Sequence, residues 1–282
     1  MKRKSWFKTV WKNAQLRVGC IMLLVLLLLG IFAPLLAPYD PYVLSDDMVV
    51  PPSLSHPLGT DGLGRDVLSM LIYGTRTSLL VGTVAALIAG VIGTLLGGIA
   101  GYYGKATGAI IGEGINIFMM MPTFFLILIV VALFGSGMGK MMVVIGLTTW
   151  VGNAKLMRAE AMSLRQRTFV RSAEATGESN IAILFRHIIP NGIYPIIANT
   201  TMGVASAILT ESSLAFLGLG DPNVVSWGQI IQAGRSYLLD GWWICTFSGL
   251  AIVFTVVTFY LIGDGLNTVL SPKLNTIRGG DA

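Results

Sequence analysis

The sequence SLLVGTVAALIAGVIGTLLGGIAG, residues 78–101, decides the fold. It carries no charge and exceeds the roughly 20 apolar residues with which a helix crosses the hydrocarbon core of a bilayer. Small residues about four positions apart share one face of a helix and let a second helix approach closely in a membrane. The stretch therefore predicts a tightly packed membrane-spanning helix. Its glycines are Gly82, Gly90, Gly93, Gly97, Gly98 and Gly101.

The rest of the chain has the same character. Of 282 residues, 54% are hydrophobic and only 12% are charged, and the mean hydropathy is +0.75. A soluble domain carries about 25% charged residues, so this chain has too few charges for a surface that faces water. We predict an all-α membrane protein with about six transmembrane helices and no separate soluble domain. The other apolar runs cover residues 18–36, 115–134, 138–156, 193–214 and 242–263.

The basic residues predict the orientation. Of the 19 Lys and Arg residues, only Arg65, Arg76, Lys140 and Arg235 fall in the segments on one side of the predicted membrane. Because cytoplasmic segments carry the excess of Lys and Arg, both termini are expected inside. This gives a first transmembrane helix over residues 18–37, an extracytoplasmic loop over 38–77, a core of five transmembrane helices over 78–270 and a cytoplasmic tail over 271–282. The net charge of +5 follows from this topology, so no nucleic-acid partner is expected.

Residues 1–17 predict a helix in the headgroup region. Lys4, Lys8 and Lys12 recur at helical spacing, and Trp6 and Trp11 lie on the other side. Cations facing anionic lipid and aromatics facing the apolar layer are typical of such helices. An unstructured basic tail is the alternative.

Residues for catalysis or metal binding are missing from the sequence. His56 and His187 are predicted on opposite sides of the membrane, and Cys20 and Cys245 read as small hydrophobic residues. Asp264 lacks the motif and the second intramembrane acid of an aspartyl protease, and no phosphate-cradling glycine loop is present. We expect no metal site and no enzyme activity, so any ATP must be bound by another chain.

The longest polar segment, KLMRAEAMSLRQRTFVRSAEATGESNIAILFRHIIPN, covers residues 155–191. It predicts a short helix over 169–176 that Gly177 ends, then a helix over 181–189 that Pro190 halts. Small residues, Ser172, Ala173 and Ala175, would let the short helix lie deep in a partner's groove. An ordinary amphipathic connector is the alternative.

Within this segment, FVRSAEATG (169–177) followed by FRHIIPN (185–191) resembles the coupling segment of ABC importer permeases. Gly177 matches the glycine of that motif, Ala173 its second alanine and Pro190 its last proline. The chain departs from the usual Glu-Ala-Ala start at Arg171 and Ser172, as the peptide and nickel branch of the superfamily does. The coupling segment would be residues 158–191. The residues implied in ATPase coupling are Phe169, Arg171, Ser172, Ala173, Glu174, Ala175, Gly177, Arg186 and Pro190.

Three further stretches are similar to the C-type permease of dipeptide, oligopeptide and nickel importers. They are HPLGTDGLGRDVLSMLIYGTRTSLLVG (56–82), TESSLAFLGLGDP (210–222) with SWGQII (226–231), and LIGDGLNTVLSPKL (261–274). The resemblance extends over residues 18–274.

The resemblance implies a type I importer permease in a prokaryotic plasma (inner) membrane. The implied partners are a homologous second permease subunit, two cytoplasmic ABC ATPases and an extracytoplasmic substrate-binding protein. ATP and Mg would bind to the ATPases, and this chain would hold no cofactor. Movement of the helix near residues 169–177 would switch the pore, so we expect a bulky or charged residue at Ala173 or Gly177 to uncouple transport.

Two further groups of residues are candidates with open roles. Glu211, the acid well along the fifth span, is a pore candidate or a structural residue, and Asn199 and Met202 are weaker pore candidates. In the outer loop a tight turn with local pairing is favoured over substrate contact. The residues of that motif are Gly59, Asp61, Gly64, Arg65 and Asp66.

The cargo stays open at this stage. Di- or oligopeptides are the main hypothesis, and nickel or a metal chelate carried by the same machinery is the alternative. A stand-alone channel or ion-coupled carrier would leave the polar segment unexplained, and it would favour inverted repeats, which the sequence does not display.

Overall fold

The computed structural model describes residues 13–270, which are mostly helical. These residues contain no strand, only an isolated bridge between Thr60 and Asp66, so the all-α class is confirmed. Most of the predicted helix over residues 1–17, and all of the tail over 271–282, lie outside the described residues. The elements are α2 (Ala14–Ile31), α3 (Ala33–Leu36), α4 (Val67–Tyr103), α5 (Lys105–Met120), α6 (Thr123–Phe134), α7 (Met138–Thr149), α8 (Val151–Arg165), α9 (Thr168–Ala175), α10 (Asn180–Ile183), the π turn η1 (Leu184–Ile188), α11 (Ile189–Phe216), α12 (Trp227–Gly234), the 3-10 turn η2 (Arg235–Tyr237) and α13 (Trp242–Leu270).

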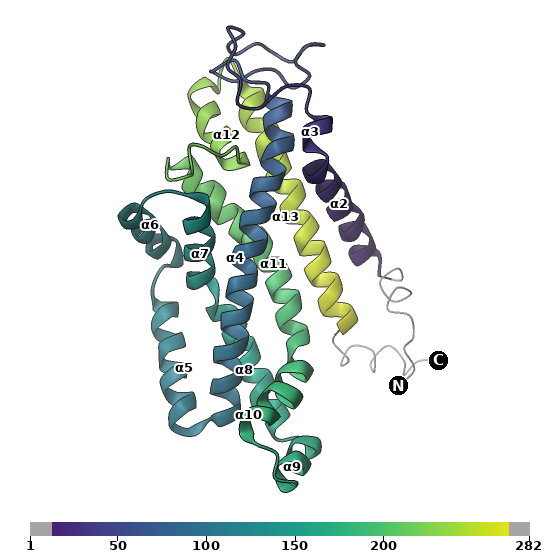
Figure 1. Ribbon diagram of the computed structural model, residues 1–282, viewed down its shortest axis with the longest axis vertical. Helices are drawn as coiled ribbons and strands as arrows, with labels where there is room; N and C mark the ends of the chain where they lie inside the picture. Colours follow the sequence, from purple (N-terminus) through teal and green to yellow (C-terminus); the bar gives the residue numbers. More distant parts are fainter. Residues whose placement is uncertain (1–12, 271–282) are drawn as a thin grey trace.

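Helix α4 lies at the centre of the bundle, with α7, α8 and α11 packed along it (Figure 1). Helix α13 packs on α11, and α2 packs on α13. Gly19 of α2 contacts Ile262 of α13, and Leu16 contacts Gly265, so these two helices are antiparallel. Helix α9 lies at one end of the molecule, and α12 with the loop before α4 lies at the other (Figure 1).

Four of the described helices are long and apolar enough to cross a membrane, namely α2, α4, the continuous helix over residues 180–216 and α13. The count rises to five if α5 and α6 form one bent span, and α7, with 12 residues, is too short alone. Only Trp150 separates α7 from α8, and both pack along α4. The predicted span over 138–156 is therefore two helices in succession. The six-span topology with both termini inside stays a prediction.

The predicted span over residues 115–134 is not one continuous helix, although α5 and α6 can still form one bent span. Helices α5 and α6 meet at an angle of 83° around Met121 and Pro122. Proline lacks the N–H that a helix interior requires and drives the preceding residue toward extended conformations. Met121 has such a conformation, with φ −85° and ψ 126°. Hydropathy is high on both sides of the break, so an apolar run alone does not reveal it.

The second span is longer than the predicted residues 78–101. Helix α4 begins at Val67, so residues 67–77, assigned above to the outer loop, are helical. Asp66 begins the helix as its N-cap, because its Oδ2 accepts the Ser69 N–H at 2.8 Å.

The prediction that Pro190 halts a helix over 181–189 is wrong. Helix α10, η1 and α11 follow one another without a break over residues 180–216. The N–H of Ile189 donates to the carbonyl of Leu184, five residues back, so the turn before Pro190 is widened. A π turn changes the hydrogen-bond register. The missing N–H of Pro190 then falls where that register changes, and the helix continues.

The glycines of α4 bring two helices close to it, as predicted. A Cβ added at Gly93 would lie 2.7 Å from the carbonyl oxygen of Trp150, and one at Gly101 would lie 2.5 Å from that of Arg158. Gly97, between them, contacts the backbone of Ala154. Another face of α4 packs on α11, where Gly82 contacts Ile208. Any side chain on the α8 face would separate the two backbones.

We predict that Gly97→Ala lowers the free energy of unfolding by about 1–3 kcal/mol, because the added methyl group overlaps with the Ala154 backbone. Thermal unfolding in detergent measures the effect. Gly249→Ala is the matched control, since nothing lies within 4 Å of a Cβ added there in α13. It should leave stability unchanged or slightly raised. Equal unfolding temperatures for the two variants would contradict the prediction.

Candidate functional site

The short helix predicted over residues 169–176 is α9, Thr168–Ala175. Val170 and Ala173, one turn apart, are its buried residues. They join an apolar cluster that contains Tyr102 of α4 together with Met157, Ala161, Ile183, Leu184, Ile188 and Ile196. Helix α9 therefore packs on the end of α8 and on α10, and its buried face belongs to the cluster that they share with α4 and α11.

Gly177 ends α9 through its backbone conformation. Its φ is +81°, the left-handed region that favours glycine. The N–H of Gly177 donates to the carbonyl of Glu174, and that of Glu178 donates to the carbonyl of Ala173, both at 3.1 Å. These two bonds form a Schellman motif, which satisfies the last carbonyls of a helix.

The orientation of Ala173 corrects the expectation drawn from its small size. Ala173 is 8% exposed and faces the cluster inside this chain. A bulky residue there would disturb this chain's own packing before it reached a partner. The outward face of α9 instead presents Phe169, Arg171, Ser172, Glu174 and Ala175.

The segment after α9 is tied back to the bundle. His187 Nε2 lies 2.8 Å from Glu178 Oε2, and Arg186 pairs with the other oxygen of Glu178 at 3.4 Å. The hydroxyl of Tyr102 donates to Asn180 Oδ1 at 2.9 Å. Pro190 is exposed. Residues 168–190 thus form one surface, held to α4 and to the start of α11.

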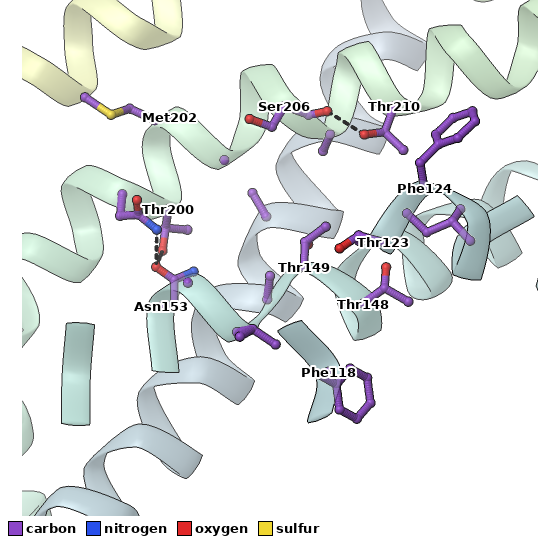
Figure 2. A pocket seen from close by; sticks show the side chains of 18 of the residues that line it. Phe118, Thr123, Phe124, Thr148, Thr149, Asn153, Thr200, Met202, Ser206 and Thr210 are labelled. Atoms are coloured by element: carbon purple, nitrogen blue, oxygen red, sulfur yellow. Dashed lines mark hydrogen bonds between the residues drawn. The ribbon is translucent and has the colours of Figure 1, made fainter. Parts of the chain in front are cut away.

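A cavity of about 680 Å³ lies in the middle of the bundle (Figure 2). Its polar lining consists of hydroxyl and amide groups from α6, α7, α8 and α11, and no lining residue is charged. Aromatic side chains and methionines complete the wall. The residues with hydroxyl or amide groups are Thr123, Thr148, Thr149, Asn153, Asn199, Thr200, Ser206, Thr210 and Tyr260. The other large side chains are Phe118, Met119, Phe124 and Met202.

Asn153 holds the polar groups of this cavity together. Its Oδ1 accepts from Asn199 Nδ2 at 2.9 Å and from Thr200 Oγ1 at 3.4 Å. The residue is buried, and its Cβ contacts Gly93 of α4. One amide therefore links α8 to α11 where α4 and α8 are closest.

The three pore candidates separate in the structure. Asn199 and Met202 line the cavity, whereas Glu211 does not. Glu211 is 4% exposed, and its Oε1 accepts the hydroxyl of Ser226 at 2.7 Å. Ser226 is the N-cap of α12, so the two stretches TESSLAFLGLGDP and SWGQII meet at this bond. The geometry places Glu211 at a helix junction.

The outer-loop residues make contacts inside the loop and with α13. Asp61 pairs with Arg65 at 2.7 Å, and Asp66 lies 3.0 Å from His56 Nδ1. Gly59 and Gly64 both have positive φ, +76° and +74°. Trp243 of α13 donates from Nε1 to the carbonyl of Thr60 at 3.1 Å, so the turn is anchored to the bundle.

Two functional positions were missed at the sequence level. Asn153 lies inside a predicted apolar span. A polar amide side chain in such a span indicates a functional position, and this could have identified Asn153 from the sequence. Asp221, in the loop after α11, accepts the N–H of Met138 at 3.0 Å and so joins that loop to the start of α7. Among residues 13–270, no three His, Cys, Asp or Glu side chains lie together as a metal site would require.

Comparison with known proteins identifies the family. Residues 93–276 match the inner membrane component of binding-protein-dependent transport systems. The chain belongs to this family. Residues 6–56 match the N-terminal transmembrane domain of oligopeptide transport permease C. This permease is thus a multi-pass protein of the inner membrane, and its family is one of transport subunits rather than enzymes.

Curated relatives of this permease cover nearly its whole length. The dipeptide transport system permease protein DppC of Alkalihalophilus pseudofirmus is 36% identical over 273 residues, 96% of this chain and 90% of that protein. The probable D,D-dipeptide transport system permease protein DdpC of Escherichia coli is 37% identical over 272 residues, 94% and 91% of the two chains. The glutathione transport system permease protein GsiD of Pectobacterium atrosepticum is 36% identical over 277 residues, 97% and 92%.

We predict that the bond between Asp221 and α7 makes the permease sensitive to acid. The backbone N–H groups of Met138 and Asn223 lower the pKa of Asp221 below its ordinary value of 3.8. The stabilisation is therefore complete above that value and is lost as pH falls through the lower pKa of the folded state. Thermal unfolding across this range should show wild type more stable than Asp221→Asn at neutral pH, with the difference closing in acid. Asp46→Asn, at an exposed acid of the outer loop, is the control. A difference that does not change with pH would contradict the prediction.

Proposed function

We propose that this chain is a pore-forming permease subunit of an ATP-driven, binding-protein-dependent ABC importer for di- and oligopeptides. The relatives named above are described as transporting dipeptides, D,D-dipeptides and glutathione, all of them peptides. Nickel as cargo is not favoured, because none of these names refers to it. The family supports ATPase and binding-protein partners in general, and the composition given below is part of the proposal.

The central cavity is the observation that carries this proposal. A peptide presents amide N–H and carbonyl groups at every residue, and the hydroxyl and amide groups of Thr149, Asn199 and Ser206 can donate to and accept from them. The uncharged lining favours no particular side-chain charge. A passage for peptides of varied sequence needs such a lining, because the charge of the peptide side chains varies. A passage for a metal cation would be expected to offer carboxylate or imidazole ligands.

The exposed face of α9 is proposed as the contact surface for a cytoplasmic ATPase. Helix α9 packs on α8 and α10 and shares a cluster with α4 and α11, so a push on its outer face would be passed to the ends of these helices. Those helices line the cavity further along. ATP and Mg would bind to two ATPase subunits, and this chain would hold no cofactor.

A homologous second permease subunit is proposed to complete the pore. The substrate-binding protein would dock at the opposite end from α9, where the outer loop and α12 lie (Figure 1). A stand-alone channel or ion-coupled carrier is not favoured, because it would have no use for an anchored surface such as α9.

A bulky side chain in the cavity should block transport. We expect Ser206→Phe to reduce peptide uptake by at least about tenfold, since it fills space in a cavity of about 680 Å³ while leaving α9 unchanged. Uptake of a labelled dipeptide and of nickel is measured in proteoliposomes with the partner subunits and the binding protein. Ser213→Phe, two turns further along the same face of α11 and likewise exposed but outside the cavity lining, is the matched control. Normal peptide uptake by Ser206→Phe, or uptake of nickel in place of peptide, would refute the proposal.

A charge on the outer face of α9 should uncouple the ATPase. Ser172 is exposed, so Ser172→Arg should leave thermal stability unchanged while ATPase copurification and ATP-dependent uptake fall. Ser163→Arg, at an exposed serine near the end of α8, is the control for added charge. Gly177→Arg should also uncouple, with strain at its positive φ as a second cause. Unchanged copurification and uptake in Ser172→Arg would show that α9 is not the contact surface.

A further inference from the structure

A second pocket, of about 580 Å³, lies at the α9 end of the molecule. It is formed by the turn between α4 and α5, the end of α8, and α9, and it shares no residue with the central cavity. Its volume is within the range of about 300–1,000 Å³ that is typical of small-molecule sites. The lining residues are Ala100, Gly101, Gly104, Lys105, Gly108, Ala109, Arg158, Met162, Arg165, Gln166, Arg171 and Glu174.

The pocket carries an excess of positive charge. Lys105, Arg158, Arg165 and Arg171 line it against a single carboxylate, Glu174. Among residues 13–270, the ion pairs involve Arg65, Arg186 and the two histidines, so none of these four cations is neutralised by a carboxylate. Arg158 is half-buried, with its guanidinium against Gly112 of α5. Lys105, Arg165 and Arg171 are exposed, and Arg165 donates to the carbonyl of Tyr103. A group of cations without a carboxylate partner attracts an anion from outside.

The other lining residues are mostly apolar. Ala100, Gly101, Gly108 and Ala109 belong to the adjoining ends of α4 and α5, and Met162 belongs to α8. A pocket whose lining combines cations with apolar walls matches an amphiphile whose phosphate group is followed by a hydrocarbon part. Basic pockets between transmembrane helices on the cytoplasmic side are suited to anionic lipid headgroups, and the Lys and Arg distribution predicts that this end faces the cytoplasm.

The backbone at the pocket supports a functional role. Gly104 and Lys105 both have positive φ, +58° and +43°. A lysine in this region is strained, and such strain is retained where the surrounding structure requires it. Here the strained turn places Lys105 in the lining beside Arg158 and Arg165.

We propose that this pocket binds the phosphate group of an anionic membrane phospholipid. Free inorganic phosphate has the same headgroup chemistry but lacks the hydrocarbon part that the apolar walls accommodate. Because Arg171 and Glu174 belong to α9, the bound lipid bridges α9 to the turn between α4 and α5.

The experiment compares lipid retention by two double variants of the full chain, extracted from the membrane with its partner subunits. Arg158→Gln with Arg165→Gln removes two cations of the pocket. Lys155→Gln with Arg167→Gln removes two exposed cations of the same region that do not line it. Binding of phosphatidylglycerol and of phosphatidylcholine is measured by native mass spectrometry, with inorganic phosphate as a competitor. Thermal unfolding checks that both variants fold.

Wild type and the control variant should prefer phosphatidylglycerol, and the pocket variant should lose about thirtyfold in affinity, because each cation near a charged headgroup contributes a factor of about five. High salt should weaken the preference. Equal retention by the two double variants would overturn the proposal. Displacement by millimolar inorganic phosphate would assign the site to free phosphate, and so reject the lipid. Loss of ATPase copurification with unchanged lipid binding would assign the cations to the ATPase contact, which also rejects it.

Discussion

The backbone contact between α4 and α8 is the constraint on which the other features depend. Gly93, Gly97 and Gly101 leave no side chain between the two helices, so α8 lies directly against the central helix. At one end this contact fixes Asn153, whose amide joins α8 to α11 at the cavity. At the other end it fixes Ala161 beneath α9. Inside a membrane, water exclusion does not drive helices together, so such close packing carries much of the association.

The same contact connects the end at α9 with the cavity, because α4 and α8 supply residues to both. Helix α4 and the continuous helix over residues 180–216 each have 37 residues, which at 1.5 Å per residue is about 55 Å, well beyond the roughly 30 Å hydrocarbon core. Both are therefore longer than the hydrocarbon core requires, and one end of each, at Tyr102 and at Ile183, belongs to the cluster around Val170 and Ala173. A displacement of α9 by the ATPase proposed above would be passed first to α8 and α10, the helices on which α9 packs. Packed interfaces of this kind move between discrete arrangements rather than deform continuously.

Residue patterns predicted those features that depend on local chemistry. The glycine spacing of residues 78–101 predicted close helix packing, and Gly177 predicted the end of α9, because both follow from the absence of a side chain. The helix breaks at Pro122 but continues through Pro190. A proline alone therefore does not show whether a helix ends, and at Pro190 the preceding π turn allows the helix to continue. Ala173 was assigned outward because its size was considered without its spacing from Val170. Asn153 links α8 to α11 only when α4, α8 and α11 pack together, and no local sequence pattern predicts that packing.

The break between α5 and α6 divides the cavity into two sides of different character. One side of the cavity comes from α4, α8 and α11, whose positions the glycine contacts and Asn153 fix. The other side comes from Phe118 and Met119 before the break and from Thr123, Phe124 and Ile127 after it. Only Ile127 and Val131 of α6 are buried, and this helix packs mainly on α7. The fixed side therefore supplies most of the polar groups, while the more weakly held α5–α6 side supplies aromatic and apolar cover. Helices α5 and α6 therefore form the less tightly packed wall of the cavity, with α5 held on α4 and α8 and α6 held mainly on α7.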